Sequence, residues 1–144
     1  GTIVRQTMFA EFEKIIPAVA ESGEALTIDR FRSEYRKLLE LYFGEGMLIH
    51  EGLELEGLRI PHFYRAFYVY KYATGLSAAI ALSQMVMEGG KTERDRYLSF
   101  LKSGGSKFPL DQLRDAGVDL EKPDAVNAAM AKFRELVDQL AELV

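Results

Sequence analysis

The spacing of the apolar residues is the feature that most limits how this chain can fold. These residues recur three or four positions apart near both ends of the chain and between residues 27 and 43, as one face of an α-helix requires. Near the N-terminus the recurring side chains are Ile3, Met8, Phe9, Phe12, Ile15, Ile16 and Val19. We predict helices over residues 2–21, 27–43 and 124–143, with Pro17 kinking the first helix or starting a separate last turn.

Glycine and proline set the other boundaries. Residues 44–60 contain three interior glycines and an alternation of glutamate with leucine, so we predict a loop with at most one short extended piece. Pro61 suits the first position of a helix, which we expect to run to about Glu88. Shorter helices are expected over residues 91–101 and 111–116. The prediction is an all-α fold of about six helices with long loops, forming a single domain over residues 1–144.

Composition excludes several classes of function. The net charge of −4 gives no basic patch for nucleic acid or an anionic membrane, so we expect neither partner. A stretch of membrane length, residues 66–87, contains Lys71, Thr74 and Gln84, which favour a buried helix over a membrane span. The absence of cysteine excludes disulfides and fits a reducing compartment, from which we expect a cytoplasmic protein.

The residues also limit the catalytic chemistry of this chain. A zinc site needs about three or four protein ligands, whereas the histidines are His50 and His62 only, without an HExxH pair. We therefore predict no metal site within the chain. Glu51, Glu54 and Glu56 could form an acidic pocket, although a solvated loop is the favoured interpretation.

Aromatic residues and a histidine are concentrated in residues 62–72, directly after Pro61, and we call this stretch the aromatic segment. Read as one helix, this segment carries rings on two adjoining faces, with Phe63, Phe67 and Tyr70 on one of them. One interpretation is a core helix whose tyrosines find buried partners. The other is the wall of a cleft, where phenol groups and the His62 imidazole point at a ligand carbonyl.

Several segments of the chain resemble the C-terminal part of oligoendopeptidase F, in the thimet oligopeptidase family of zinc metallopeptidases. They are RIPHFYRAFYVYKYATGLSAA (residues 59–79), VRQTMFAEFE (4–13), GEALT (23–27), FLKSGGSKFPLDQLRDAGVDLEKP (100–123) and FRELVDQLAELV (133–144). The resemblance implies a mostly helical fold around a deep channel and the hydrolysis of internal bonds in short peptides. It also implies that the HExxH helix and the zinc lie in an upstream part of a larger parent enzyme.

The resemblance assigns roles to residues of the aromatic segment. His62 corresponds to the histidine that contacts the substrate opposite the zinc, and Tyr70 to the tyrosine that helps to hold the tetrahedral intermediate. Tyr64 and Tyr68 are weaker matches, expected to bind substrate. The rings of Phe63 and Phe67 are expected to line subsites and exclude water.

Two hypotheses follow for the function of the chain. In the first, the chain is the substrate-binding segment of a zinc oligopeptidase, inactive alone, whose partners are short peptides and the upstream catalytic part of the same enzyme. An apolar patch left where that part docks would then make the isolated chain self-associate. In the second, it is a stand-alone helical interaction module without catalytic activity. A reading frame that continues upstream into an HExxH helix would separate the two.

Overall fold

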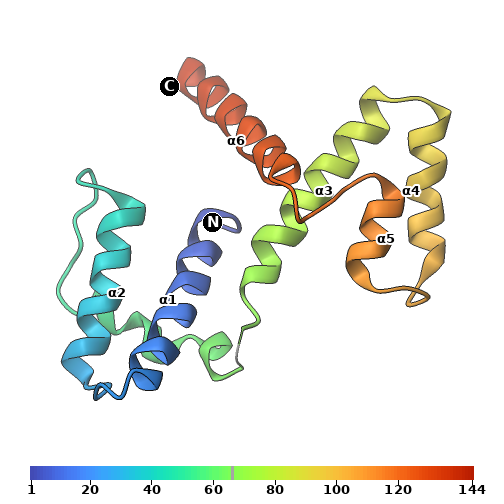
Figure 1. Ribbon diagram of the computed structural model, residues 1–144. Coiled ribbons are helices and arrows are strands. Elements are labelled where there is room, and N and C mark those ends of the chain that lie inside the picture. The colour runs from blue at the N-terminus through green and yellow to red at the C-terminus, as the bar shows by residue number, and fades with distance from the viewer. Residues whose placement is uncertain (66) are drawn as a thin grey trace. The chain divides into compact units, whose positions relative to one another are not determined.

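A computed structural model describes residues 1–65 and 67–144 of the chain (Figure 1). All regular elements in this part of the chain are helices, which confirms the all-α prediction. The α-helices are α1 (Val4–Glu21), α2 (Ile28–Phe43), α3 (Tyr70–Glu88), α4 (Lys91–Ser103), α5 (Pro109–Ala116) and α6 (Asp124–Leu143), and the 3-10 helices are η1 (Leu53–Arg59) and η2 (Pro61–Tyr64). The chain divides into two compact units, Gly1–Ala73 and Thr74–Val144, and the boundary falls in the first turns of α3. The expectation of one domain stays a prediction.

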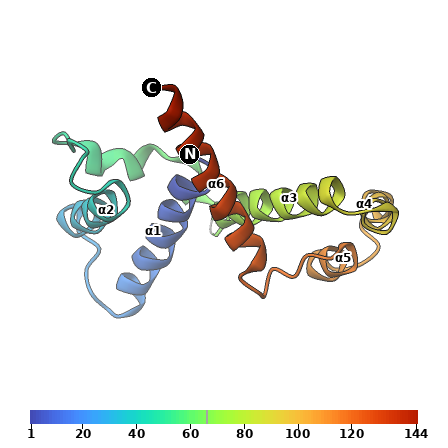
Figure 2. The same ribbon diagram turned by 90° about the horizontal axis from the view of Figure 1, so that it is seen from above.

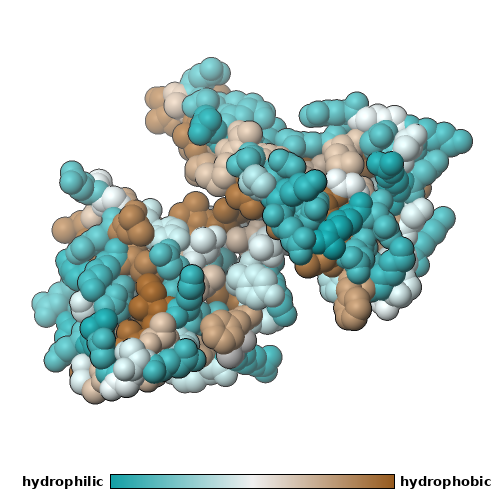
Figure 3. All heavy atoms as spheres, in the orientation of Figure 1, coloured by the Kyte–Doolittle hydropathy of each residue, from teal (hydrophilic) through white to brown (hydrophobic). Residues whose placement is uncertain are grey.

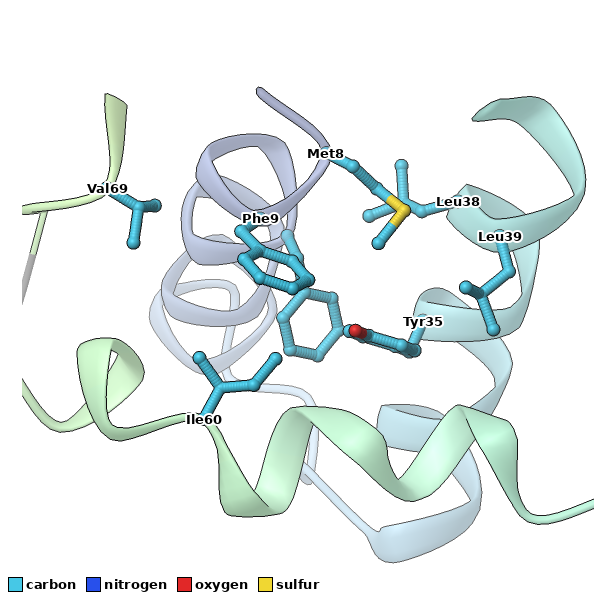
Figure 4. Packing of buried hydrophobic residues seen from close by; sticks show 8 residues of the cluster. Met8, Phe9, Tyr35, Leu38, Leu39, Ile60 and Val69 are labelled. Carbon is cyan, nitrogen blue, oxygen red and sulfur yellow. The ribbon is translucent and has the colours of Figure 1, made fainter. Parts of the chain in front are cut away.

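The first unit is built around aromatic rings of α1 and α2. The ring of Phe12 lies edge-on to those of Phe31 and Tyr35, each with a centroid separation of 4.9 Å. Figure 4 shows Ile60 and Val69 approaching this cluster from the later part of the unit. The aromatic segment after Pro61 is therefore anchored on the core at both ends.

The ends of the first two helices follow from local chemistry. The Thr27 side chain accepts a hydrogen bond from the Arg30 N–H at 3.2 Å, and Gly44 ends α2 with a φ of +67°, both as the sequence predicts. Pro17 lies inside α1, which continues to Glu21, so the proline does not start a separate last turn.

The predicted loop or extended piece between Gly44 and Ile60 is wrong for its second half, which forms the 3-10 helix η1. Glu54 and Glu56 are only 4% and 8% exposed, so the solvated interpretation is also wrong for these two carboxylates. Arginines neutralise them: Arg32 lies 2.5 Å from Glu54, and Arg5 lies 2.5 Å from Glu56. The hydrogen bond from Arg32 lowers the pKa of Glu54. The glutamates thus hold η1 against α1 and α2.

The single helix predicted from Pro61 to about Glu88 is also wrong in its first part. Pro61 opens η2, as its fixed φ allows, but that helix ends at Tyr64 and α3 begins at Tyr70. Arg65 is extended, and Phe67 has a φ of +57°, a left-handed conformation that no α-helix accommodates. The helical faces predicted for the aromatic residues therefore do not exist as such.

The core of the second unit combines buried apolar residues of three helices. Ala78 and Leu82 of α3, Ala116 of α5 and Ala125 of α6 are buried in one cluster. Helices α4 and α5 lie side by side in Figures 1 and 2. Gly117 closes α5 with a φ of +104°, as predicted for this position. Within the described residues, no helix is both long and apolar enough to span a membrane.

Candidate functional site

The candidate site is a group of three rings formed by His62, Tyr68 and Tyr72. The His62 imidazole stacks on the Tyr68 ring, with centroids 5.7 Å apart and an interplanar angle of 7°. The Tyr72 ring stands edge-on to both, at centroid distances of 5.6 Å. Its hydroxyl oxygen lies 3.2 Å from Nε2 of His62. These contacts fix the plane of the imidazole and the position of one ring nitrogen.

The break between η2 and α3 is what brings these rings together. His62 is on η2, Tyr68 is in the connection, and Tyr72 is in the first turn of α3. In a continuous helix, residues 62 and 68 would lie on different faces, since six residues correspond to about 600° of rotation. The left-handed Phe67 redirects the chain so that the Tyr68 ring can cover the imidazole.

The environment favours the neutral phenol at Tyr72. A hydrogen bond with the Tyr68 side chain raises the pKa of Tyr72, and partial desolvation acts in the same direction. The Lys71 ammonium lies 5.2 Å from the centroid of the Tyr68 ring, a cation–π distance. Because the pKa of Tyr72 is raised, its hydroxyl remains protonated at neutral pH and can share a hydrogen bond with the His62 imidazole.

The other predicted site residues lie along the same segment but have different surroundings. Tyr70 opens α3, and its side chain is 49% exposed. Tyr64 is 74% exposed, and its hydroxyl donates to the Leu58 carbonyl at 2.7 Å. Phe67 is 54% exposed, whereas Phe63 packs on the core, its centroid 5.5 Å from that of Phe9. The phenols of this segment are thus accessible from outside the first unit.

An apolar cavity adjoins the aromatic segment within the first unit. It has a volume of about 370 Å³ and is lined by residues of α1, η1 and η2, together with Phe31 and Phe67. Phe12, Phe31, Phe63 and Phe67 contribute rings to its lining, and Glu13 contributes a carboxylate. The two phenylalanines predicted to line subsites therefore share a cavity wall.

Tyr72 is the member of this ring group that the sequence prediction did not assign to the site. Ten positions separate it from His62, a spacing that gives no contact on a regular helix. The pair is possible only because the helix is interrupted at Phe67, between η2 and α3. A non-glycine residue with positive φ leaves little trace in a single sequence, so no available signal identified this partner.

The residues that the structure describes do not form a metal site. No group of three or more His, Cys, Asp or Glu side chains among residues 1–65 and 67–144 could hold a metal ion. His62 has two tyrosine rings as neighbours, and the buried Glu54 and Glu56 are paired with arginines. What this arrangement offers is a set of hydrogen-bond donors beside apolar surface.

Comparison with known proteins identifies the class to which this fold and site belong. Residues 1–132 match the model of Peptidase family M3. The chain therefore belongs to peptidase family M3. The oligopeptidase PepF of Bacillus subtilis strain 168 is 49% identical over the whole chain, and the chromosomal oligoendopeptidase F of Lactococcus lactis subsp. cremoris is 42% identical over the same length. The resemblance to oligoendopeptidase F noted from the sequence motifs is thereby confirmed.

A solved structure gives the same result for the fold. The crystal structure of oligoendopeptidase-F from Enterococcus faecium superimposes with a TM-score of 0.95 and 37% sequence identity, covering 99% of this chain and 27% of that one. The chain likewise covers 22% of the Bacillus subtilis protein and 24% of the Lactococcus lactis protein. It therefore spans about a quarter of the length of its relatives.

Proposed function

We propose that this chain is the C-terminal, substrate-binding segment of a zinc-dependent oligoendopeptidase that hydrolyses internal bonds of short peptides in the cytoplasm. Membership of a peptidase family supports peptide hydrolysis as the reaction of the parent enzyme. The observation that carries the proposal is the contact group of His62, Tyr68 and Tyr72 on an accessible segment that also presents Tyr70. Phenols and an imidazole placed there can donate hydrogen bonds to a peptide.

In this proposal the donors act on the carbonyl of the bond that is cleaved. Attack by water places negative charge on the carbonyl oxygen, and a fixed donor stabilises that charge more in the transition state than in the bound substrate. Tyr70 is the proposed donor to this oxygen, and His62 contacts the peptide nearby. Tyr64 and Tyr68 bind the peptide backbone, while Phe63 and Phe67 supply apolar surface for its side chains.

The residues of this chain do not fit the zinc ion that the proposal requires. Among the described residues there is no cluster of potential ligands, and His62 is engaged with tyrosines. We therefore derive no step through a metal from this chain and assign the metal ligands to the upstream part of the parent enzyme. That part and short peptides are the proposed partners. Purified alone, the chain is expected to leave a fluorogenic peptide uncleaved, with or without added zinc; zinc-dependent turnover would contradict this assignment.

The proposal is tested by removing the donors in the full-length parent enzyme. For His62→Ala and Tyr70→Phe we expect kcat to fall by a factor on the order of 10²–10³, the loss typical for one donor to a developing oxyanion. Tyr42→Phe is the matched control, because it removes a hydroxyl that donates to Glu11 at 2.8 Å, away from the aromatic segment. If both site variants kept peptide turnover within about twofold of the unaltered enzyme, the assigned roles would be wrong.

A further inference from the structure

Glu13 is a buried carboxylate of α1 that none of the roles above uses. Its side chain is 7% exposed, and its Oε1 accepts a hydrogen bond from the backbone N–H of Phe67 at 2.6 Å. The two residues are 54 positions apart in the chain. A bond from an N–H to an ionised carboxylate is stronger than one between neutral groups. Glu13 therefore ties the connection between η2 and α3 directly to the core helix.

The bond falls at the one point of the connection that needs support. Among the described non-glycine residues, Phe67 alone has a positive φ, +57°. For an L-residue with a side chain this conformation is unfavourable and persists only when the surroundings hold it. The Glu13 carboxylate holds the Phe67 N–H on one side, and two residues later the fully buried Val69 anchors the chain in the core.

The residue between these two anchors is Tyr68, whose ring stacks on His62. Fixing the backbone at Phe67 and Val69 leaves Tyr68 little freedom to leave the imidazole. We infer that Glu13 is a positioning residue for the His62, Tyr68 and Tyr72 group: its carboxylate selects the left-handed turn at Phe67 that places the Tyr68 ring over His62. This inference rests on the proposed function, because positioning matters only if these rings contact substrate.

A second glutamate on α1 provides the matched control. Glu11 accepts a hydrogen bond from the Tyr42 hydroxyl of α2 at 2.8 Å, so it too joins α1 to another element. Its partner belongs to α2, outside the segment of residues 61–72. Glu13→Met and Glu11→Met each replace a carboxylate by an apolar side chain of similar length. Only the first removes the acceptor for Phe67.

The kinetic test uses the full-length parent enzyme with peptide substrate. We expect Glu13→Met to lower kcat about tenfold or more with KM changed less than threefold, because misplacement of positioned groups acts mainly on the reacting geometry. Glu13→Gln keeps an oxygen acceptor without the charge, so it should recover most of the lost kcat. Glu11→Met should stay within about twofold of the unaltered enzyme. Equal kcat losses for Glu11→Met and Glu13→Met would reduce Glu13 to a structural residue and overturn the inference.

Hydrogen exchange gives a readout that does not depend on activity. In the full-length enzyme, the amide of Phe67 should exchange faster in Glu13→Met than in Glu11→Met, at equal melting temperature. If Glu13→Met does not fold, Glu13→Asp decides, because it keeps the charge but withdraws the acceptor from the Phe67 N–H by one methylene. An unchanged kcat then refutes positioning, and faster exchange at Phe67 with a lower kcat at unchanged melting temperature supports it. His62→Ala and Tyr70→Phe in the same series separate the two proposals. If His62→Ala and Tyr70→Phe are inactive while Glu13→Met is fully active, only the inference about Glu13 is refuted. If both of these site variants are fully active, the proposed function fails and the inference fails with it.

Discussion

At the scale of single residues, Tyr35 and Tyr42 differ from Tyr72 in their hydrogen-bond partners. The hydroxyl of the fully buried Tyr35 donates to Glu56 at 3.0 Å, and burial raises the pKa of Tyr35. Burial and the bond to Glu11 likewise raise the pKa of Tyr42 to about 12. Tyr72 instead shares its hydroxyl with an imidazole. The phenols of Tyr35 and Tyr42 are bound to carboxylates inside the first unit, whereas the Tyr72 phenol lies in the ring group to which we assign the proposed site.

A single hydroxyl tests this distinction at Tyr72. Tyr72→Phe keeps the ring edge against His62 and removes only the oxygen that lies 3.2 Å from Nε2. We expect kcat of the full-length enzyme to fall about threefold to tenfold, as the loss of one hydrogen bond that orients the imidazole would produce. Thermal unfolding should be nearly unchanged, because the side chain is 37% exposed. A kcat equal to that of the unaltered enzyme would remove Tyr72 from the site.

At the scale of elements, η1 shows how charge can stand in for apolar contact. Oε1 of Glu56 lies 2.5 Å from Arg5 of α1 and 3.0 Å from Arg59, while its Oε2 accepts from Tyr35 of α2. The arginines are 42% and 78% exposed, so water reaches them while the carboxylate stays buried. One glutamate thereby joins η1 to both long helices of the unit.

Removing that carboxylate should weaken the whole first unit. Glu56→Ala leaves the buried Tyr35 hydroxyl without its acceptor, which costs about 1–3 kcal/mol in the free energy of unfolding. The control is Glu51→Ala, an exposed glutamate of the same stretch, for which a change within about 0.5 kcal/mol is expected. Urea unfolding followed by circular dichroism measures both. Equal stabilities for the two variants would mean that the Glu56 contacts contribute little.

The elements also show where sequence reasoning succeeds in this chain. Helices with a clear apolar period and a recognisable cap, such as α2 with Thr27 and Gly44, were predicted nearly to the residue. The errors fell on η1 and on the start of α3, where distant partners decide the conformation. The sequence predicts that Glu54 and Glu56 are solvated, because the arginines that neutralise them belong to other elements. Likewise, the turn at Phe67 depends on Glu13, a partner that no local pattern reveals.

At the scale of the whole molecule, the chain spans about a quarter of the length of its relatives. Helix α6 buries Ala125 and Ala129 but exposes an apolar stripe, visible as brown surface on this helix in Figure 3. The stripe consists of Val126, Met130, Phe133, Val137 and Leu140, which are 39–60% exposed. Their spacing of three or four residues places them along one side of the helix. A continuous apolar stripe of this kind marks an interaction surface.

We propose that the upstream part of the parent enzyme binds this stripe. When that part is absent, the stripe is expected to bind a second copy of the chain. We expect the isolated 144-residue chain to self-associate as its concentration rises, measured by sedimentation velocity. Phe133→Glu combined with Leu140→Glu should shift it toward the monomer, because two charges then interrupt the stripe. Ala131→Glu with Gln139→Glu adds the same two side chains on the opposite side of α6 and should leave association unchanged. A chain that stays monomeric at high concentration would show that the stripe needs no partner. Two double variants that behave alike would show that association does not occur through the stripe.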